Sequence, residues 1–488
     1  MVPLAIVWGA TTTVLVAFVL VMGVPLGTDA WFYQYTLWSL EHGNFVCAYP
    51  PKIGLGGPSV AVPSTFIAPL YPLLAGAVAW LVRLGSSHPF PTLGAMGRGC
   101  RDAMTAMWHW ERRAHVQRET VMLSFVGWFM LVAGVVSHGV RFGKSLWRSE
   151  VASAGLVVTS LAVASTLIQY SHPQDLVATG LVWLAVAVFL RERWVMAGIL
   201  LGLAASSNQV ALLAGLVLVV LAERGPRWRL AGAMLATLVV VYGPLLLAGG
   251  TRSYGDILAG SGFNNSLGGT VVWELGMSVP LKYVMSRVLP LGAAVLTAWW
   301  SRRRHVEPPH DIEVIVLVTV GLCWRLVFEA NLWGYYYVPV FVGLVILDRR
   351  IGHVRAGTVA WSLSQLVLYD YLPIGHEAVP ALLRHWPLFL GQLGAAAIVT
   401  SMAIVAIRHR RDRGPWLAAL AIYAFAYLLG PHLWHETVNN WPVWVHQLIL
   451  VPWALGLALS GRHASTGFPC LEPTPPISDR SMPEWEPG

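Results

Sequence analysis

The chain has 488 residues, of which 56% are hydrophobic and 11% are charged, and its mean hydropathy is +0.61. Repeated apolar runs of roughly 20 residues have the length that crosses a bilayer's hydrocarbon core as a helix, which excludes an ordinary soluble domain. A net charge of +8 would suggest nucleic acid as the partner of a soluble chain. Here the arginines cluster between apolar runs, which is typical of membrane topology and not of a nucleic-acid surface.

The first apolar run, residues 4–24, predicts a retained transmembrane helix. No Lys or Arg precedes it and no small-residue cleavage site stands out before Pro25, so a signal peptide is not expected. Asp29 follows in Gly27-Thr28-Asp29, where a catalytic base could meet lipid-borne and aqueous substrates together. Its simpler role would be to end the helix and to be hydrated among the headgroups.

Residues 63–84 are apolar enough to cross the membrane, but three prolines disturb a continuous helix there: Pro63, Pro69 and Pro72. We therefore expect an interfacial or re-entrant helix inside a long first outer loop, residues 25–119. If residues 63–84 crossed instead, every later loop would change side, and Asp29 would lie across the membrane from His172.

The later apolar runs predict an all-α, polytopic bundle of about thirteen to fourteen spans. They lie at residues 120–140, 151–169, 176–190, a close pair within 195–222, 230–249, 279–300, 312–329, 335–348, 356–372, 386–407, 415–433 and 441–460. Basic clusters between the runs mark the inner side, as the positive-inside rule expects. They are Arg141/Lys144/Arg148, Arg191/Arg193, Arg224/Arg227/Arg229, Arg302 to Arg304, Arg349/Arg350/Arg355 and Arg408/Arg410/Arg411/Arg413.

This pattern predicts three parts of the chain. Residues 1–350 form the catalytic transmembrane module, with a second outer loop at 250–278 that is rich in Gly, Ser and Asn. Residues 351–463 add further transmembrane helices. Residues 464–488 lack apolar periodicity and are expected to form a disordered cytoplasmic tail.

Motifs of soluble enzymes, such as Walker A, GxGxxG, HExxH and GxSxG, are absent from the sequence, and the four cysteines have no metal-binding spacing. The chemistry is therefore expected among polar residues near the ends of the apolar runs. The candidates are Asp29, His172, Asp175, Asn208, Lys282, Arg287, Arg325, Glu329, Asn331 and Tyr336.

The order of these features resembles the GT-C superfamily of membrane glycosyltransferases, particularly the polyprenyl-phosphomannose-dependent mannosyltransferases of actinobacteria. The resemblance covers about residues 1–350. The matching pieces are Gly27-Thr28-Asp29, Ala68-Pro-Leu-Tyr-Pro72, His172-Pro-Gln-Asp175, Arg191-Glu-Arg193, Met196 to Ala205 and Trp333-Gly-Tyr-Tyr-Tyr-Val-Pro339. The chain departs from many relatives at Ser206-Ser-Asn-Gln209, where they carry a lysine, because Asn208 can donate a hydrogen bond but has no charge.

The resemblance implies an inverting transfer of a sugar from a polyprenyl-phosphate-linked donor to a hydroxyl of a glycolipid or polysaccharide. Mannose is the expected sugar. The reaction would take place on the outer face of the plasma membrane, with Asp29 as general base. Polyprenyl phosphate leaves as a stable anion, so it needs cations or hydrogen-bond donors and no strong acid. The resemblance implies no definite cofactor and no nucleic-acid partner, and it leaves the need for a divalent metal open.

In such a glycosyltransferase the other candidate residues would have two groups of roles. Arg325 is the first candidate for the donor phosphate, because an arginine inside an apolar run faces a polar cavity or a partner. Lys282, Arg287 and His172 are the next. The candidates for acceptor or sugar contact are Asp175, Glu329, Asn331, Tyr336 and Asn208.

Simpler roles stay open for several of these residues. Arg325 could pair with Glu329 one turn later, and Asp175 could cap a helix. Lys282 and Arg287 could reach lipid headgroups. The alternative function is a transporter or flippase of a lipid-linked or small polar substrate, although the chain shows no internal repeat that would favour one. A polymerase or ligase of outer-face polysaccharide is a third reading.

Overall fold

The structure is a computed structural model that describes residues 118–138, 172–249, 279–304, 311–329 and 334–351, together with residues 272, 277, 455, 456 and 459. These residues form helices and no strands, which confirms the all-α prediction for this part of the chain. No helix within these ranges is both long and apolar enough to cross a membrane. Asp29, Asn331, most of both predicted outer loops, and the predicted helices at 4–24, 63–84, 151–169 and beyond 351 lie outside the described ranges.

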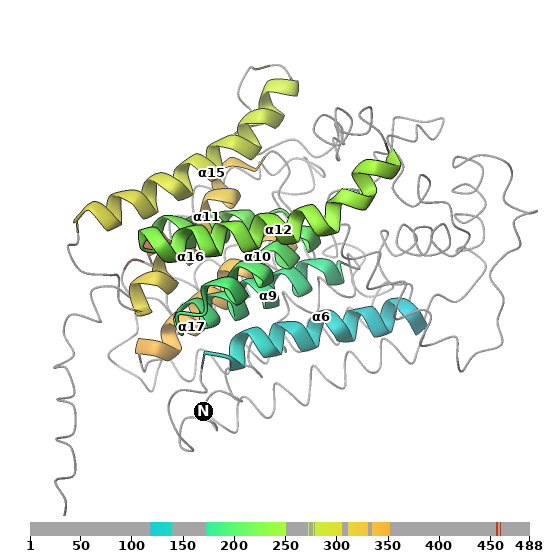
Figure 1. Cartoon of the computed structure of the whole chain (residues 1–488), viewed down its shortest axis with the longest axis horizontal. Coiled ribbons are helices and arrows are strands. Elements are labelled where there is room, and N and C mark those ends of the chain that lie inside the picture. Colours follow the sequence, from blue (N-terminus) through green and yellow to red (C-terminus); the bar gives the residue numbers. More distant parts are fainter. Residues whose placement is uncertain are drawn as a thin grey trace, which may run out of the picture.

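Each described helix coincides with one of the predicted apolar runs between residues 120 and 348. The helices pack side by side as a bundle (Figure 1). They are α6 (Arg118–Val136), α9 (Pro173–Phe189), α10 (Trp194–Ser207), α11 (Ala211–Leu221), α12 (Arg224–Gly249), α15 (Val279–Arg304) and α16 (Asp311–Phe328), followed by the short 3-10 helix η2 (Gly334–Tyr337) and α17 (Val338–Ile351). The close pair expected within 195–222 is present as α10 and α11.

Several helices extend beyond the predicted runs into the basic clusters. Helix α12 begins at Arg224, before the predicted start at residue 230, and α15 continues to Arg304. Arginine favours helix almost as well as leucine, so the loss of apolar character does not end these helices. The basic residues at 224–229 and 302–304, which we expected between helices, therefore lie on helix ends.

The core of the bundle lies between α9, α10, α11, α16 and α17. Trp183 of α9 is fully buried, and its indole Nε1 donates a hydrogen bond to the carbonyl oxygen of Pro339 at 3.1 Å. Gly343 of α17 leaves the space that this ring occupies, because a Cβ on Gly343 would lie 2.5 Å from the Cζ2 atom of Trp183. The position of Trp183 thus joins α9 to the first turn of α17.

Glycines bring two pairs of helices into close contact. On α10, Gly198 and Gly202 have GxxxG spacing, and both face α12, where a Cβ on Gly202 would lie 2.5 Å from the Cβ of Thr237. Gly134 of α6 similarly faces Gly180 of α9. Small residues at such positions are typical of helix packing in membranes, because they let two backbones approach.

Candidate functional site

Polar side chains from separate elements meet at one end of the bundle. They come from the start of α9, the turn between α10 and α11, the first half of α15, the end of α16 and η2. We call this group the polar network. It consists of His172, Gln174, Asp175, Asn208, Arg287, Arg325, Glu329 and Tyr336.

The first half of the polar network is centred on Asp175. The Nδ1 atom of His172 lies 3.1 Å from the Oδ2 atom of Asp175 and 2.8 Å from the amide nitrogen of Gln174. The side-chain amide of Asn208 donates to the other oxygen of Asp175. The Oδ1 atom of Asn208 accepts from the backbone N–H of Val210 at 3.0 Å, which holds the turn into α11.

The second half is centred on Glu329. Arg325 donates from Nε to the Oε2 atom of Glu329 at 3.0 Å, one helical turn away. Arg287 of α15 approaches the same carboxylate from another side, with its NH1 atom 3.3 and 3.1 Å from the two oxygens. The guanidinium of Arg325 also lies 3.8 Å from the centre of the Tyr336 ring, in cation–π geometry.

Arg325 joins the two halves. Its NH1 atom donates to the Oδ1 atom of Asn208 at 3.3 Å, so an unbroken chain of contacts runs from His172 to Arg287. Burying charged groups is costly unless they are paired, and the network contains two carboxylates and two guanidinium groups. The charges of these four side chains therefore balance.

Burial differs along the network. Asp175 and Glu329 are almost fully buried, at 4% and 2% exposed. The side chain of Arg325 is 11% exposed, whereas that of Arg287 is 40% exposed and makes its hydrogen bonds through NH1. Arg287 is therefore the cation of this network that an anion arriving from outside would meet first.

The structure answers two of the simpler alternatives. Arg325 does pair with Glu329, but it also contacts Asn208 and Tyr336. Asp175 is not the N-cap of α9, so that prediction was wrong: the N-cap is His172, and Pro173 begins the helix. Proline at the first helical position has its φ already set for a helix and lacks an N–H that would be unpaired there, so the helix begins before the acid.

Sequence reasoning missed Gln174, which lies beside two predicted residues and contacts His172. The sequence indicated Gln174 only through its position inside the segment His172-Pro-Gln-Asp175. Lys282 is buried on α15, the helix that carries Arg287. Asp29 and Asn331 lie outside the described residues.

No metal site is evident among the described residues, because they contain no group of three or more His, Cys, Asp or Glu that could hold an ion. Near the opposite end of α15, burial and then the neighbouring charge of Arg227 lower the pKa of Arg302 from its ordinary value.

Comparison of the sequence with protein-family models and with curated proteins found no match.

Proposed function

We propose that this chain is an integral membrane glycosyltransferase with a GT-C-like polytopic bundle. It would transfer a sugar from a polyprenyl-phosphate-linked donor to a hydroxyl of a glycolipid or polysaccharide on the outer face of the plasma membrane. The sugar that we expect is mannose. The observation that carries the proposal is the polar network. Residues selected for this chemistry from distant parts of the sequence lie together in it, among otherwise apolar helices.

The geometry favours Arg287 as the group that contacts the donor phosphate. Buried charges at membrane depth mark functional sites, and an arginine can bind a phosphate through two parallel N–H groups. Arg287 is half-exposed, and Glu329 holds it through NH1 alone, which leaves other N–H groups for a ligand. Arg325 is enclosed by Glu329, Asn208 and Tyr336, so its role in this proposal is to fix the carboxylate that positions Arg287.

Asp29 would act as the general base that takes the proton of the acceptor hydroxyl as its oxygen attacks the anomeric carbon. The bond to the phosphate oxygen breaks, and polyprenyl phosphate leaves as an anion. This role rests on the resemblance at Gly27-Thr28-Asp29. His172, Asp175, Asn208 and Tyr336 border the same end of the bundle and are proposed to contact the sugar or the acceptor, and the sequence motif adds Asn331.

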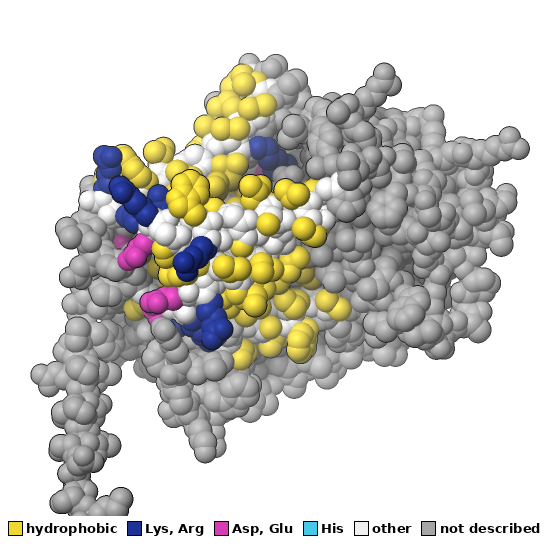
Figure 2. Space-filling model, viewed as in Figure 1, with side chains coloured by type: hydrophobic (Ala, Val, Ile, Leu, Met, Phe, Trp, Pro, Cys, Tyr) yellow, Lys and Arg dark blue, Asp and Glu magenta, His cyan; other side chains and the backbone are white. Residues whose placement is uncertain are grey.

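The surface of α12 and α15 supports a membrane location. Along α15, exposed apolar side chains recur at helical spacing, at Leu281, Val284, Val288, Leu296 and Trp300, all 46–63% exposed. On α12, Trp228, Leu235, Val239 and Val240 are 60–75% exposed. The apolar side chains form a broad surface with basic residues gathered mainly toward one end of it (Figure 2). Such a surface is unfavourable in water and suits lipid contact.

The test is transfer of radiolabelled mannose from polyprenyl-phosphomannose by the purified full-length protein. Asp29→Asn should remove transfer while donor binding persists, because only the proton acceptor is lost. Arg287→Gln should weaken donor binding about tenfold or more, because a charge-assisted hydrogen bond is lost. Arg303→Gln is the matched control, since Arg303 is an exposed arginine farther along the same helix.

Two outcomes would contradict the proposal. If no donor of this class yields a glycoside, the enzyme reading fails. If substrate uptake into liposomes depends on Asp29 and Arg287 while no glycoside forms, the chain is a transporter or flippase, and the paired charges of Arg325, Glu329 and Arg287 are coupling or gating groups.

A further inference from the structure

A basic surface lies at the end of the bundle opposite the polar network, where α12 begins and α15 ends. We call it the basic rim, and it consists of Arg224, Arg227 and Arg229 of α12 and Arg302 of α15. Arg227 and Arg302 lie side by side, because both donate to the carbonyl oxygens of Val220 and Ala222 at the end of α11. None of the four arginines forms an ion pair with a carboxylate of the described residues, so the positive charge of the rim is not neutralised by direct pairing.

The basic rim reaches the surface together with tryptophan. Arg224 and Arg229 are exposed, and Trp228 between them is 75% exposed. Trp300, two residues before Arg302 on α15, is 59% exposed. Tryptophan beside arginine at one end of a helical bundle is typical of the interface between a membrane and water, where the ring lies at the level of the headgroups.

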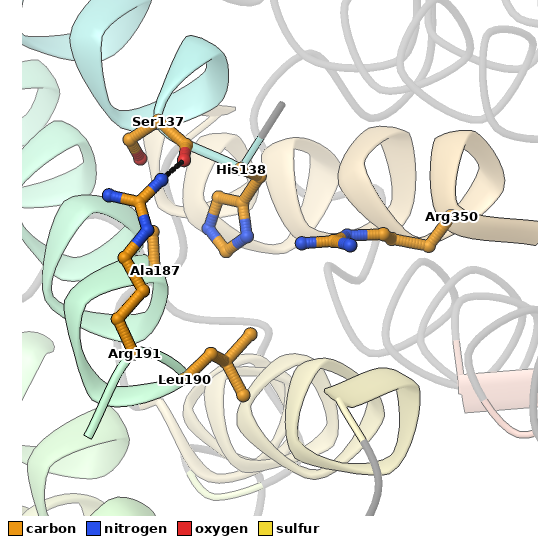
Figure 3. Close-up of a pocket in the computed structure, with 6 residues that line it drawn as sticks. All are labelled: Ser137, His138, Ala187, Leu190, Arg191 and Arg350. Carbon is orange, nitrogen blue, oxygen red and sulfur yellow. Dashed lines mark hydrogen bonds between the residues drawn. The ribbon is translucent and has the colours of Figure 1, made fainter. Parts of the chain in front are cut away.

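A further arginine at this end of the bundle is directed inward and does not belong to the rim. The NH2 atom of Arg191 donates to the carbonyl oxygen of Ser137 at 2.6 Å (Figure 3). Arg191 thus joins the end of α9 to the end of α6. No hydrogen bond with the described residues holds Arg224 or Arg229 in this way, so their guanidinium groups can bind a ligand from outside.

Apolar side chains continue from the rim along the exposed faces of the same two helices. We call them the apolar strip, and they are Leu235 and Val239 on α12 and Leu296 and Val288 on α15, all 57–63% exposed. At the rise of an α-helix, Trp228 to Val239 and Trp300 to Val288 each span about 17–18 Å. The hydrocarbon of one membrane leaflet is about 15 Å deep, half of about 30 Å, so the strip has the length of an acyl chain.

We propose that the basic rim and the apolar strip together bind an anionic phospholipid. Its phosphodiester accepts charge-assisted hydrogen bonds from Arg224 and Arg229, and an acyl chain lies along the strip. A soluble anion would use the rim alone, and a lipid without net charge would gain nothing from the positive charge of the rim. This inference rests on the membrane location proposed above, but not on the transfer of a sugar.

Carboxylates at the same end reduce the positive charge and provide a test of opposite sign. They are Glu192, Glu223, Asp311 and Glu313. Glu223 is exposed and directly precedes Arg224. Removal of its charge should therefore strengthen the binding of an anionic headgroup, whereas the loss of a rim arginine should weaken it.

The experiment equilibrates the full-length protein in detergent with equal amounts of phosphatidylglycerol and phosphatidylcholine, purifies it again and quantifies the retained lipids by mass spectrometry. Both headgroups contain a phosphodiester, but choline cancels its charge. Each basic residue near an anionic lipid changes affinity about fivefold, so the unmodified chain should retain phosphatidylglycerol in about tenfold excess.

Three variants test the residues. Arg224→Gln combined with Arg229→Gln should lower the excess to about twofold or less. Arg224→Lys combined with Arg229→Lys is the matched control, because it keeps both charges and should preserve most of the excess. Glu223→Gln should increase the excess.

Equal retention of the two lipids by the unmodified chain would overturn the proposal, and so would an undiminished excess in the double glutamine variant. The first comparison needs no variant, so it decides the matter even if a variant fails to fold. Release of the chain from membranes by alkali without detergent would instead reject the membrane location. A failure of sugar transfer leaves this inference standing, because binding of the headgroup requires no sugar donor.

Discussion

At the scale of single residues, Glu329 is the branch point of the polar network. One carboxylate, 2% exposed, accepts hydrogen bonds from Arg325 on its own helix and from Arg287 on α15. Two arginines therefore hold the Glu329 carboxylate from two directions. Removing one member of a buried charge group costs more than the group contributes, because the remaining charge is left without compensation.

Glu329→Gln tests this role. The change keeps the shape of the side chain but leaves two arginines without their carboxylate, so the free energy of unfolding should fall by about 3 kcal/mol. The measurement is denaturation of the purified variant followed by tryptophan fluorescence. Glu192→Gln, at an exposed turn, should lie within about 0.5 kcal/mol of the unmodified protein. Equal stability of the two variants would show that the pairing contributes nothing.

At the scale of helices, small residues decide which helices touch. Gly202 of α10 faces Thr237 and Met234 of α12, and a Cβ there would lie 2.9 Å from the backbone oxygen of Met234. A backbone atom cannot turn aside as a side chain can. The contact between α10 and α12 therefore depends on the absence of a side chain at this position.

Gly202→Ala should lower the free energy of unfolding by about 1–3 kcal/mol, because the added methyl group overpacks this contact. Gly232→Ala on α12 is the matched control, since a Cβ there meets no atom within 4 Å. Alanine favours helix over glycine, so the control should be neutral or more stable by up to about 1 kcal/mol. Melting temperatures of both variants check this, and a stabilised Gly202→Ala would contradict the packing described.

The end of α11 is held by two arginines from other helices. Arg302 of α15 donates from NH1 to the carbonyl oxygens of Val220 at 2.6 Å and Leu221 at 3.0 Å, and also to that of Ala222. Arg227 of α12 donates to two of the same carbonyl oxygens. These oxygens have no partner inside their own helix, and cations are favourable at a helix C-terminus. Burial and then the neighbouring charge of Arg227 lower the pKa of Arg302, yet an arginine stays protonated at neutral pH.

Arg302→Met should cost about 1–2 kcal/mol of stability, because it removes a charge-assisted contact to several carbonyl groups. Arg303→Met is the adjacent control. Arg303 is exposed and its guanidinium packs 4.0 Å over the ring of Trp299, so its removal should cost about 1 kcal/mol or less. Chemical denaturation of the two variants separates them, and a larger loss at Arg303 would refute the capping role.

At the scale of the whole molecule, the two ends of the bundle differ in chemistry. The network end carries the paired charges around Asp175 and Glu329, whereas the other end gathers most of the described arginines, among them Arg191 and Arg302, with Glu192, Glu223, Asp311 and Glu313 at the same end. Exposed apolar side chains cover α12 and α15 between these ends. Under the proposed membrane location, the positive-inside rule predicts that the network end faces the outside of the cell.

Single cysteines at Gln209 and Arg193 test this orientation in a background in which the four native cysteines are serine. A thiol reagent that cannot cross membranes should label Gln209→Cys, at the network end, in intact cells. It should label Arg193→Cys only after permeabilisation. Labelling of both from outside, or of position 193 alone, would reject the proposed topology, and positions near 60, 90 and 145 extend the test to the rest of the chain.

The sequence alone determined that this part of the chain is helical and where its helices lie, because apolar runs and helix-forming residues are local properties. It also selected most members of the polar network, since a charged or amide side chain beside an apolar run is visible by its contrast. It misplaced the start of α9, because proline is favourable at the first helical position and the helix begins at Pro173, before the acid. It also placed the start of α12 and the end of α15 at their apolar boundaries, although arginine continues a helix.

Only the tertiary structure decided which of these residues meet. Two arginines pair with Glu329. Arg325 lies four residues earlier in the sequence, whereas Arg287 comes from another helix, whose rotation and depth are set by packing. Local composition fixes the helices, but the partners of a buried charge depend on side-chain contacts between helices distant in sequence.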